Sequence, residues 1–160
     1  MDRGFKYDVF ISAAQDDLLK GKELYEALRK NGISSYLYTD NRIADDFEKK
    51  VLSGLATSEY FVVLASASAC QSSWVKREHE IFSEYEAKDS TRKIFRMKIG
   101  KGCPELLPGK IIHAETIELL VPEVVRYYVE QRRRDCADLT ETVHHIETQL
   151  AKRDGEAFNH

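Results

Sequence analysis

A single glutamate, Glu78, lies in the middle of an apolar helical stripe. At ~100° per residue, it shares one face of a predicted helix with four apolar residues, Trp74, Ile81, Phe82 and Tyr85. The other charged residues of this segment point elsewhere: Lys76, Arg77, Glu80 and Glu84. Because burying an unpaired charge costs several kcal/mol, Glu78 is expected either beside a cleft or paired with a cation. Beside a cleft, such a carboxylate can stabilise positive charge that develops on a bound molecule.

The position of Glu78 in the predicted fold favours the cleft. Tyr60–Leu64 is an apolar run without polar alternation, as expected for a central strand covered on both faces. The helix of Glu78 follows it after a loop of small residues, Ser66–Ser73. In open α/β sheets, ligands collect at the carboxyl ends of the strands. The alternative is an ordinary structural salt bridge with a nearby lysine or arginine.

Strand-like and helix-like segments alternate along the chain. Helices are predicted at Asp16–Asn31, at the segment that carries Phe47 to Leu55, and after Ser73. Five runs are predicted to be strands: Tyr7–Ser12, Ile33–Tyr38, Tyr60–Leu64, Lys93–Ile99 and Ile111–Ala114. This order predicts an α/β fold, a flavodoxin-like doubly wound parallel five-stranded sheet followed by a long C-terminal helical segment.

The last part of the chain is helical in pattern from Val121 to about Lys152. It carries an apolar stripe spaced four, three, four: Leu139, Val143, Ile146 and Leu150. The stripe is shorter than the roughly three to four heptads of a coiled coil. Residues 1–130 are therefore assigned to one domain and residues 131–160 to a helical extension, which either packs on that domain or forms a subunit or partner contact.

Composition excludes several functional classes. The 160 residues suit one domain, and 24 Lys and Arg against 27 Asp and Glu argue against a nucleic-acid surface. No apolar stretch reaches the roughly 18 residues of a membrane span, and no signal peptide is expected. Three widely spaced cysteines predict no disulfide and suggest a reducing cytoplasm. The histidines lack ligand spacing, so no metal is implied.

Several segments together resemble the TIR domain, from about Tyr7 to Tyr128. These are YDVFIS, a helix closed by Asn31-Gly32, a loop with Asp40, the third-strand region VVLASASACQSSWVKRE and the loop PELLPG. The third-strand region is the most specific, because the family shows Ser, then Ser-x-Trp, then Glu four residues beyond Trp. Here these residues are Ser66, Ser72, Trp74 and Glu78.

The resemblance implies a reaction and a site. Bacterial-type members commonly cleave NAD+ at the bond between nicotinamide and ribose, with the matching glutamate, Glu78, as catalytic residue. NAD+ is then a consumed substrate and no cofactor is required. Residues expected to contact the substrate are Phe10, Ser12, Ala13, Asp40, Ile43, Phe47, Ser66, Ser72 and Trp74. The chain departs from the family pattern at Ala13, where an aromatic or histidine is usual, and at Ala69, where tyrosine is frequent.

The resemblance also implies a protein that self-associates through TIR surfaces, and the cysteines and the lack of a signal peptide predict that it is cytoplasmic. It extends to the stand-alone TIR components of Thoeris-type antiphage defence, which make a cyclic ADP-ribose-type signal for a separate effector. The absence of G-x-G-x-x-G and P-loop motifs argues against hydride transfer and phosphoryl transfer.

Two alternatives remain at the level of sequence. The first is a non-enzymatic scaffold or adaptor, which the departures at Ala13 and Ala69 favour. The second is a flavodoxin-like or receiver domain with Asp16 and Asp17 as an acidic pocket. The receiver domain is the weaker alternative, because Leu64-Ala65 stands where the third strand would need a phospho-acceptor aspartate.

Overall fold

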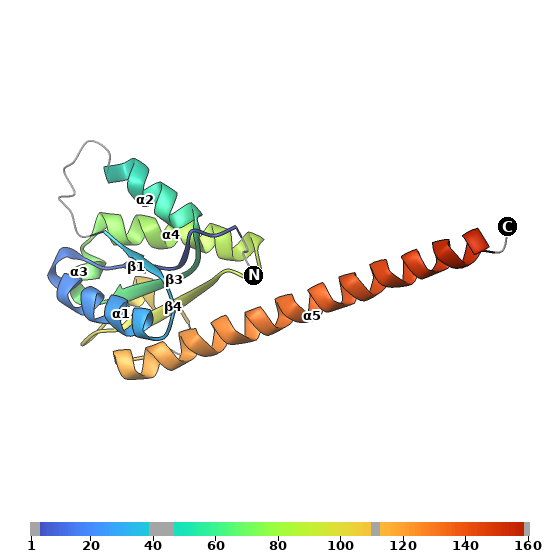
Figure 1. The fold of residues 1–160 in the computed structure, drawn as a ribbon. Helices are drawn as coiled ribbons and strands as arrows, with labels where there is room; N and C mark the ends of the chain where they lie inside the picture. Colours follow the sequence, from blue (N-terminus) through green and yellow to red (C-terminus); the bar gives the residue numbers. More distant parts are fainter. Residues whose placement is uncertain (1–3, 39–46, 110–112, 159–160) are drawn as a thin grey trace. The chain divides into compact units, whose positions relative to one another are not determined.

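The computed structural model describes residues 4–38, 47–109 and 113–158 (Figure 1). The chain divides into two compact units, which we call the α/β unit, residues 2–125, and the helical extension, residues 126–160.

The α/β unit contains a parallel sheet of four strands. These are β1 (Tyr7–Ser12), β2 (Ser35–Leu37), β3 (Ser58–Ala65) and β4 (Lys93–Lys98). They are arranged in the order β2-β1-β3-β4, with every neighbouring pair parallel. Strand β3 is buried along its whole length, as its apolar run predicts.

Helices connect the strands. The α-helices are α1 (Leu18–Lys30), α2 (Phe47–Ala56), the single-turn α3 (Ala67–Cys70), α4 (Ser73–Lys88) and α5 (Ile117–Phe158). Two 3-10 turns, Gln15–Asp17 and Pro104–Leu106, precede α1 and follow β4. In Figure 1, α2 and α4 cover one face of the sheet and α1 lies on the other. The predicted doubly wound α/β fold with a long C-terminal helix is thereby confirmed.

The sheet differs from the prediction at its last strand. Of the predicted strand Ile111–Ala114, residues 111 and 112 lie outside the described part of the chain. Ala114 forms an isolated parallel bridge with Met97, and the amide of Lys98 donates to the carbonyl of Ala114 at 2.8 Å. The described residues therefore contain four strands and one bridge, where five strands were predicted.

One face of the sheet carries a row of aromatic rings. Phe10 of β1 stacks on Tyr36 of β2 and on Phe61 of β3, with centroid distances of 5.2 and 5.7 Å. Phe61 in turn stacks on Phe82 of α4 at 5.1 Å. Helix α2 approaches this row closely at Gly54, where a β-carbon would lie 3.1 Å from the Tyr36 ring. The aromatic row thus joins the sheet to both helices of this face.

Arg92, in the connection between α4 and β4, clamps the end of α2 to the start of β3. Its Nη2 donates to the carbonyl oxygens of Leu55, at 2.9 Å, and of Ser58, at 2.6 Å. The guanidinium carbon also lies 4.9 and 4.3 Å from the ring centroids of Phe82 and Tyr85. A planar guanidinium can stack on aromatic rings and donate hydrogen bonds at the same time. A lysine ammonium is less suited to this combination.

The Arg92→Met variant is expected to lower the free energy of unfolding by about 2–3 kcal/mol, because two part-buried carbonyl groups lose a charged donor. Urea unfolding followed by circular dichroism measures this change. The matched control is Arg29→Met, which removes an exposed side chain paired with Glu26 and should change stability little. Equal effects of the two substitutions would contradict the clamp.

The prediction that the cysteines form no disulfide is wrong. Cys70 and Cys103 are bonded, with their Cα atoms 5.3 Å apart, while Cys136 is free and exposed. Cys70 ends the helix after β3, and Cys103 follows β4. Because β3 and β4 are parallel neighbours, the segments that follow them meet at the same edge of the sheet. The cysteine content therefore gives no support for a reducing compartment.

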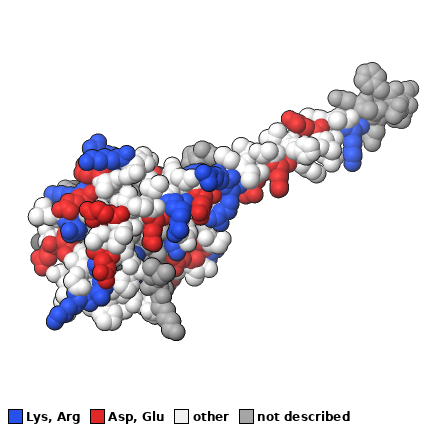
Figure 2. Space-filling view, turned by 90° about the horizontal axis from the view of Figure 1, so that it is seen from below, with Lys and Arg blue, Asp and Glu red and all other residues white. Residues whose placement is uncertain are grey.

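No helix in the described part of the chain is long and apolar enough to cross a membrane. On the face of the α/β unit seen in Figure 2, acidic and basic side chains are interspersed.

Candidate active site

Glu78 belongs to the buried face of α4. The helix begins after Ser72, whose Oγ accepts a hydrogen bond from the amide of Val75 at 3.2 Å. This cap satisfies one of the free amides of the first turn and fixes where the helix starts. Glu78 is only 5% exposed and lies one turn from the fully buried Val75 and Phe82. The prediction that a glutamate interrupts the apolar face of this helix is confirmed.

The Glu78 side chain lines a small hollow at the carboxyl ends of β1 and β2. The other lining residues come from the ends of these strands and from α2: Phe10, Ile11, Ala13, Leu37, Tyr38 and Val51. The hollow has a volume of about 10 Å³, which is room for about one water molecule. A carboxylate with apolar and aromatic walls at this edge of the sheet has the surroundings of a ligand site.

Three of the predicted site residues meet in this hollow, namely Phe10, Ala13 and Glu78. Trp74 is partly buried against the core of the unit, and its ring lies 5.7 Å from the guanidinium of Arg77. Asp40 and Ile43 lie outside the described residues, as does the side chain of Phe47.

Ser12 lies at the end of β1, beside Val63 of β3. It is 1% exposed, and its Oγ forms no hydrogen bond within the described part of the chain. A buried hydroxyl without such a partner is uncommon. Ser12 is not among the residues that line the hollow, so the structure does not bring this predicted site residue to Glu78.

The Ser66 and Ser72 side chains cap the two helices that follow β3, α3 and α4. Ser66 caps α3 by accepting from the amide of Ala69 at 3.0 Å, and its hydroxyl donates to the carboxylate of Asp17. Ser68 donates to Asp16 at 3.0 Å. The loops after β1 and β3 are therefore joined by two side-chain hydrogen bonds directly before the helix that carries Glu78.

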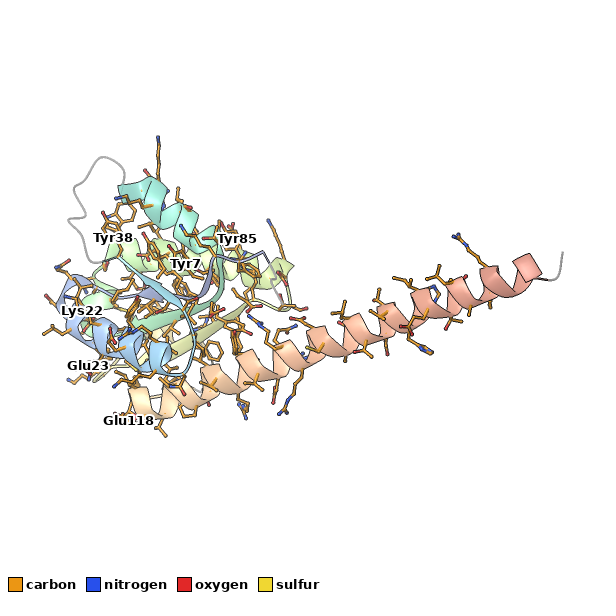
Figure 3. All side chains as sticks on the ribbon, in the orientation of Figure 1. Tyr7, Lys22, Glu23, Tyr38, Tyr85 and Glu118 are labelled. Atoms are coloured by element: carbon orange, nitrogen blue, oxygen red, sulfur yellow. A yellow bond between two sulfur atoms is a disulfide. The ribbon has the colours of Figure 1, made fainter. Side chains whose placement is uncertain are left out.

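Four residues that line the hollow were not predicted as site residues: Ile11, Leu37, Tyr38 and Val51. Tyr38, labelled in Figure 3, is 9% exposed and follows the last residue of β2. It was predicted only as the end of a strand. The position of Tyr38 at the end of a predicted strand could have identified it as a site residue, because ligands in this class of fold bind at the carboxyl ends of the parallel strands.

His79 follows Glu78 in sequence and lies against β4. Its Nε2 is 3.4 Å from Nη2 of Arg96. Burial, and then the positive charge of Arg96, lower the pKa of His79 to about 4. His79 is therefore neutral near pH 7 and can accept a hydrogen bond from Arg96.

Protonation of His79 should destabilise the fold as the pH falls. The unfolded chain binds this proton near pH 6.5 and the native state only near pH 4. The contribution of neutral His79 is thus present above about pH 6.5 and is lost between about pH 6.5 and about pH 4. Urea unfolding over this range should show a steeper loss for wild type than for His79→Gln, which keeps an acceptor without titrating. Parallel curves would contradict this assignment.

The order of the strands and the site at their carboxyl ends define a flavodoxin-like α/β domain. The family model of the TIR domain matches residues 9–152, so the chain belongs to the TIR domain family. No curated protein matches the sequence significantly.

Solved structures of TIR proteins have a similar fold. The TIR domain of the Toll-related receptor TRR-2 from Hydra magnipapillata is 17% identical with a TM-score of 0.51, over 81% of this chain and 99% of that one. A metazoan TIR-STING receptor from C. gigas is 14% identical with a TM-score of 0.56, over 79% of this chain and 41% of that one. The TIR domains of the activated Roq1 resistosome are 23% identical with a TM-score of 0.49, over 57% of each chain. The chain therefore spans only about half of the resistosome and TIR-STING chains.

Proposed function

We propose that this TIR domain cleaves the bond between nicotinamide and ribose in NAD+, with Glu78 as the catalytic residue. The observation that carries the proposal is that Glu78, a residue only 5% exposed, lines a hollow at the carboxyl ends of β1 and β2. The family includes enzymes with this activity, and the sequence pattern of Ser72, Trp74 and Glu78 matches theirs.

One carboxylate is enough for this reaction. The nicotinamide ring of NAD+ is already cationic, so it leaves with the electron pair of the broken C–N bond and needs no general acid. Positive charge then develops on the ribose, as in glycoside hydrolysis. The Glu78 carboxylate would stabilise this charge and hold the ribose hydroxyls. It would also accept the proton of a water that forms the new C–O bond, giving nicotinamide and ADP-ribose. Attack by another group of the same nucleotide would instead give a cyclic product.

Phe10 and Tyr38 are suited to be the walls of the site. Both side chains line the hollow with Glu78, and their rings can exclude water or stack on nicotinamide. A hollow with room for one water does not admit a nucleotide, so the lining side chains must move apart when NAD+ binds. Closing around the substrate would remove water from the carboxylate and strengthen its effect on the developing charge.

The test is product analysis of NAD+ incubated with the concentrated, purified chain. Liquid chromatography with mass detection should find nicotinamide together with ADP-ribose or a cyclic form, which differ in mass by one water. The proposed role is in the cytoplasm, where the nucleotide product would signal to a separate effector in antiphage defence. Such a role requires a trigger that activates the enzyme, so the assay is repeated with a lysate of phage-infected cells. If nicotinamide is released under neither condition, the proposal is overturned.

A scaffold that acts by TIR–TIR association is the second candidate. The small volume of the hollow and the lack of an aromatic side chain at Ala13 favour it. Ala69, where tyrosine is frequent in the family, is fully buried. A scaffold should bind other TIR domains and release no nicotinamide, and its binding should not depend on Glu78.

A further inference from the structure

The helical extension carries an apolar stripe that is open to solvent. Leu139, Val143, Ile146 and Leu150 are 51%, 46%, 52% and 52% exposed. The described residues of this unit form one helix, the last part of α5, and include no second element for that helix to pack against. Helices in proteins gain most of their stability from packing an amphipathic face, and a lone helix in water is marginal.

The spacing of the stripe is that of a two-helix seam. Leu139 and Ile146 lie seven residues apart, as do Val143 and Leu150, so the four occupy the two core positions of successive heptads. The four, three, four spacing reads the same from either end. An antiparallel second copy therefore places Leu139 against Leu150 and Val143 against Ile146, and the same two layers recur by symmetry.

Charge distinguishes the antiparallel from the parallel arrangement. One heptad before Leu139 stands Arg132, and one heptad after Ile146 stands Arg153. In a parallel pair, Arg153 would face Arg153 of the other copy, and like charges so placed repel. Arg132 is part-buried, and its guanidinium lies 4.2 Å from the Tyr128 ring centroid of its own chain, so the distinction depends on Arg153. In the antiparallel pair, Arg153 instead faces Cys136 of the other copy, an exposed residue without charge. The exposed Arg153 therefore disfavours the parallel pair.

We propose that this stripe is the contact surface for a second copy of the chain, which binds as an antiparallel two-helix coiled coil. Four apolar layers make about two heptads, fewer than the roughly three to four of a self-sufficient coiled coil. The dimer is accordingly weak and forms as the protein concentration rises. This contact would bring two TIR domains together through the helical extensions alone, so no surface of the α/β unit would take part in it.

Sedimentation velocity of the full chain over a range of concentrations tests the contact. The wild type should dimerise, and Ile146→Glu, which places a carboxylate opposite Val143 in two layers, should weaken the dimer by at least about tenfold. His145→Glu is the matched control, because it introduces the same charge off the stripe and should dimerise like wild type. A monomer at every concentration, or equal effects of the two substitutions, overturns the proposal. Circular dichroism verifies that each variant keeps its helix content.

A spin label on the free Cys136 tests the orientation. Cys136 and Arg153, which faces it in the antiparallel dimer, lie seventeen positions apart along the helix. The antiparallel dimer therefore places the two labelled positions ~25 Å apart along the axis. A parallel dimer would hold them only about 10 Å apart, the distance between helix axes. Pulsed electron paramagnetic resonance of the dimer should give the longer distance, and the shorter one contradicts the proposed arrangement.

Discussion

The Glu78→Gln protein is expected to release nicotinamide from NAD+ about 10²–10³-fold more slowly than wild type. Glutamine has nearly the same shape and still accepts a hydrogen bond from a ribose hydroxyl, but it carries no charge. The loss should therefore appear in kcat far more than in KM, since the charge on ribose develops only in the transition state. Steady-state kinetics of nicotinamide release separates the two parameters.

Two further substitutions on the same helix sharpen this result. Glu80→Gln removes an exposed carboxylate two residues away and should leave the kinetics unchanged. Glu78→Asp keeps the charge but withdraws it by one methylene, so its activity should lie between those of wild type and Glu78→Gln. A Glu78→Gln enzyme that works at the wild-type rate would rule out this carboxylate as the catalytic group.

Phe82→Ala is expected to lower the free energy of unfolding by about 3–5 kcal/mol, the usual cost of emptying a buried aromatic position. Phe82 is fully buried, stacks on Phe61 and meets Tyr85 edge to face at 5.8 Å. Its ring also lies against the guanidinium of Arg92. The substitution therefore leaves a cavity and also removes a ring that supports Arg92, which holds the end of α2 to the start of β3. The loss in free energy of unfolding is expected in the upper part of this range.

Urea unfolding measures the effect of Phe82→Ala. The control is Leu19→Ala in α1, since Leu19 is 76% exposed and its truncation should cost no more than about 0.5 kcal/mol. A loss below about 1 kcal/mol for Phe82→Ala would mean that the aromatic row contributes less than its burial indicates.

The local features of the site were predictable from the sequence. The apolar run of β3 and the helical periodicity after Ser73 are patterns within a few residues, and they placed Glu78 on a buried helix face at the carboxyl end of a central strand. Burial of Glu78 follows from that periodicity alone. The resemblance to the TIR family, rather than periodicity, pointed to Phe10 and Ala13, which line the hollow together with Glu78.

The features that depend on contacts between distant segments were not predictable in the same way. Cys70 and Cys103 are separated by 33 residues, and only the pairing of β3 with β4 brings them together. The wall formed by Tyr38 and Val51 depends on how α2 packs beside the end of β2. The predicted last strand, Ile111–Ala114, has only a few residues. Such a short run has too few positions for its periodicity to show where a strand begins and ends.

The proposed activity is tested most directly by nicotinamide release from NAD+ by wild type and Glu78→Gln, compared at the same concentration and under the same activating conditions. Wild type is expected to release nicotinamide, and Glu78→Gln, folded to the same extent, is expected to release almost none. Equal release by both proteins would contradict the catalytic role of Glu78, and release by neither would contradict the enzyme and favour the scaffold.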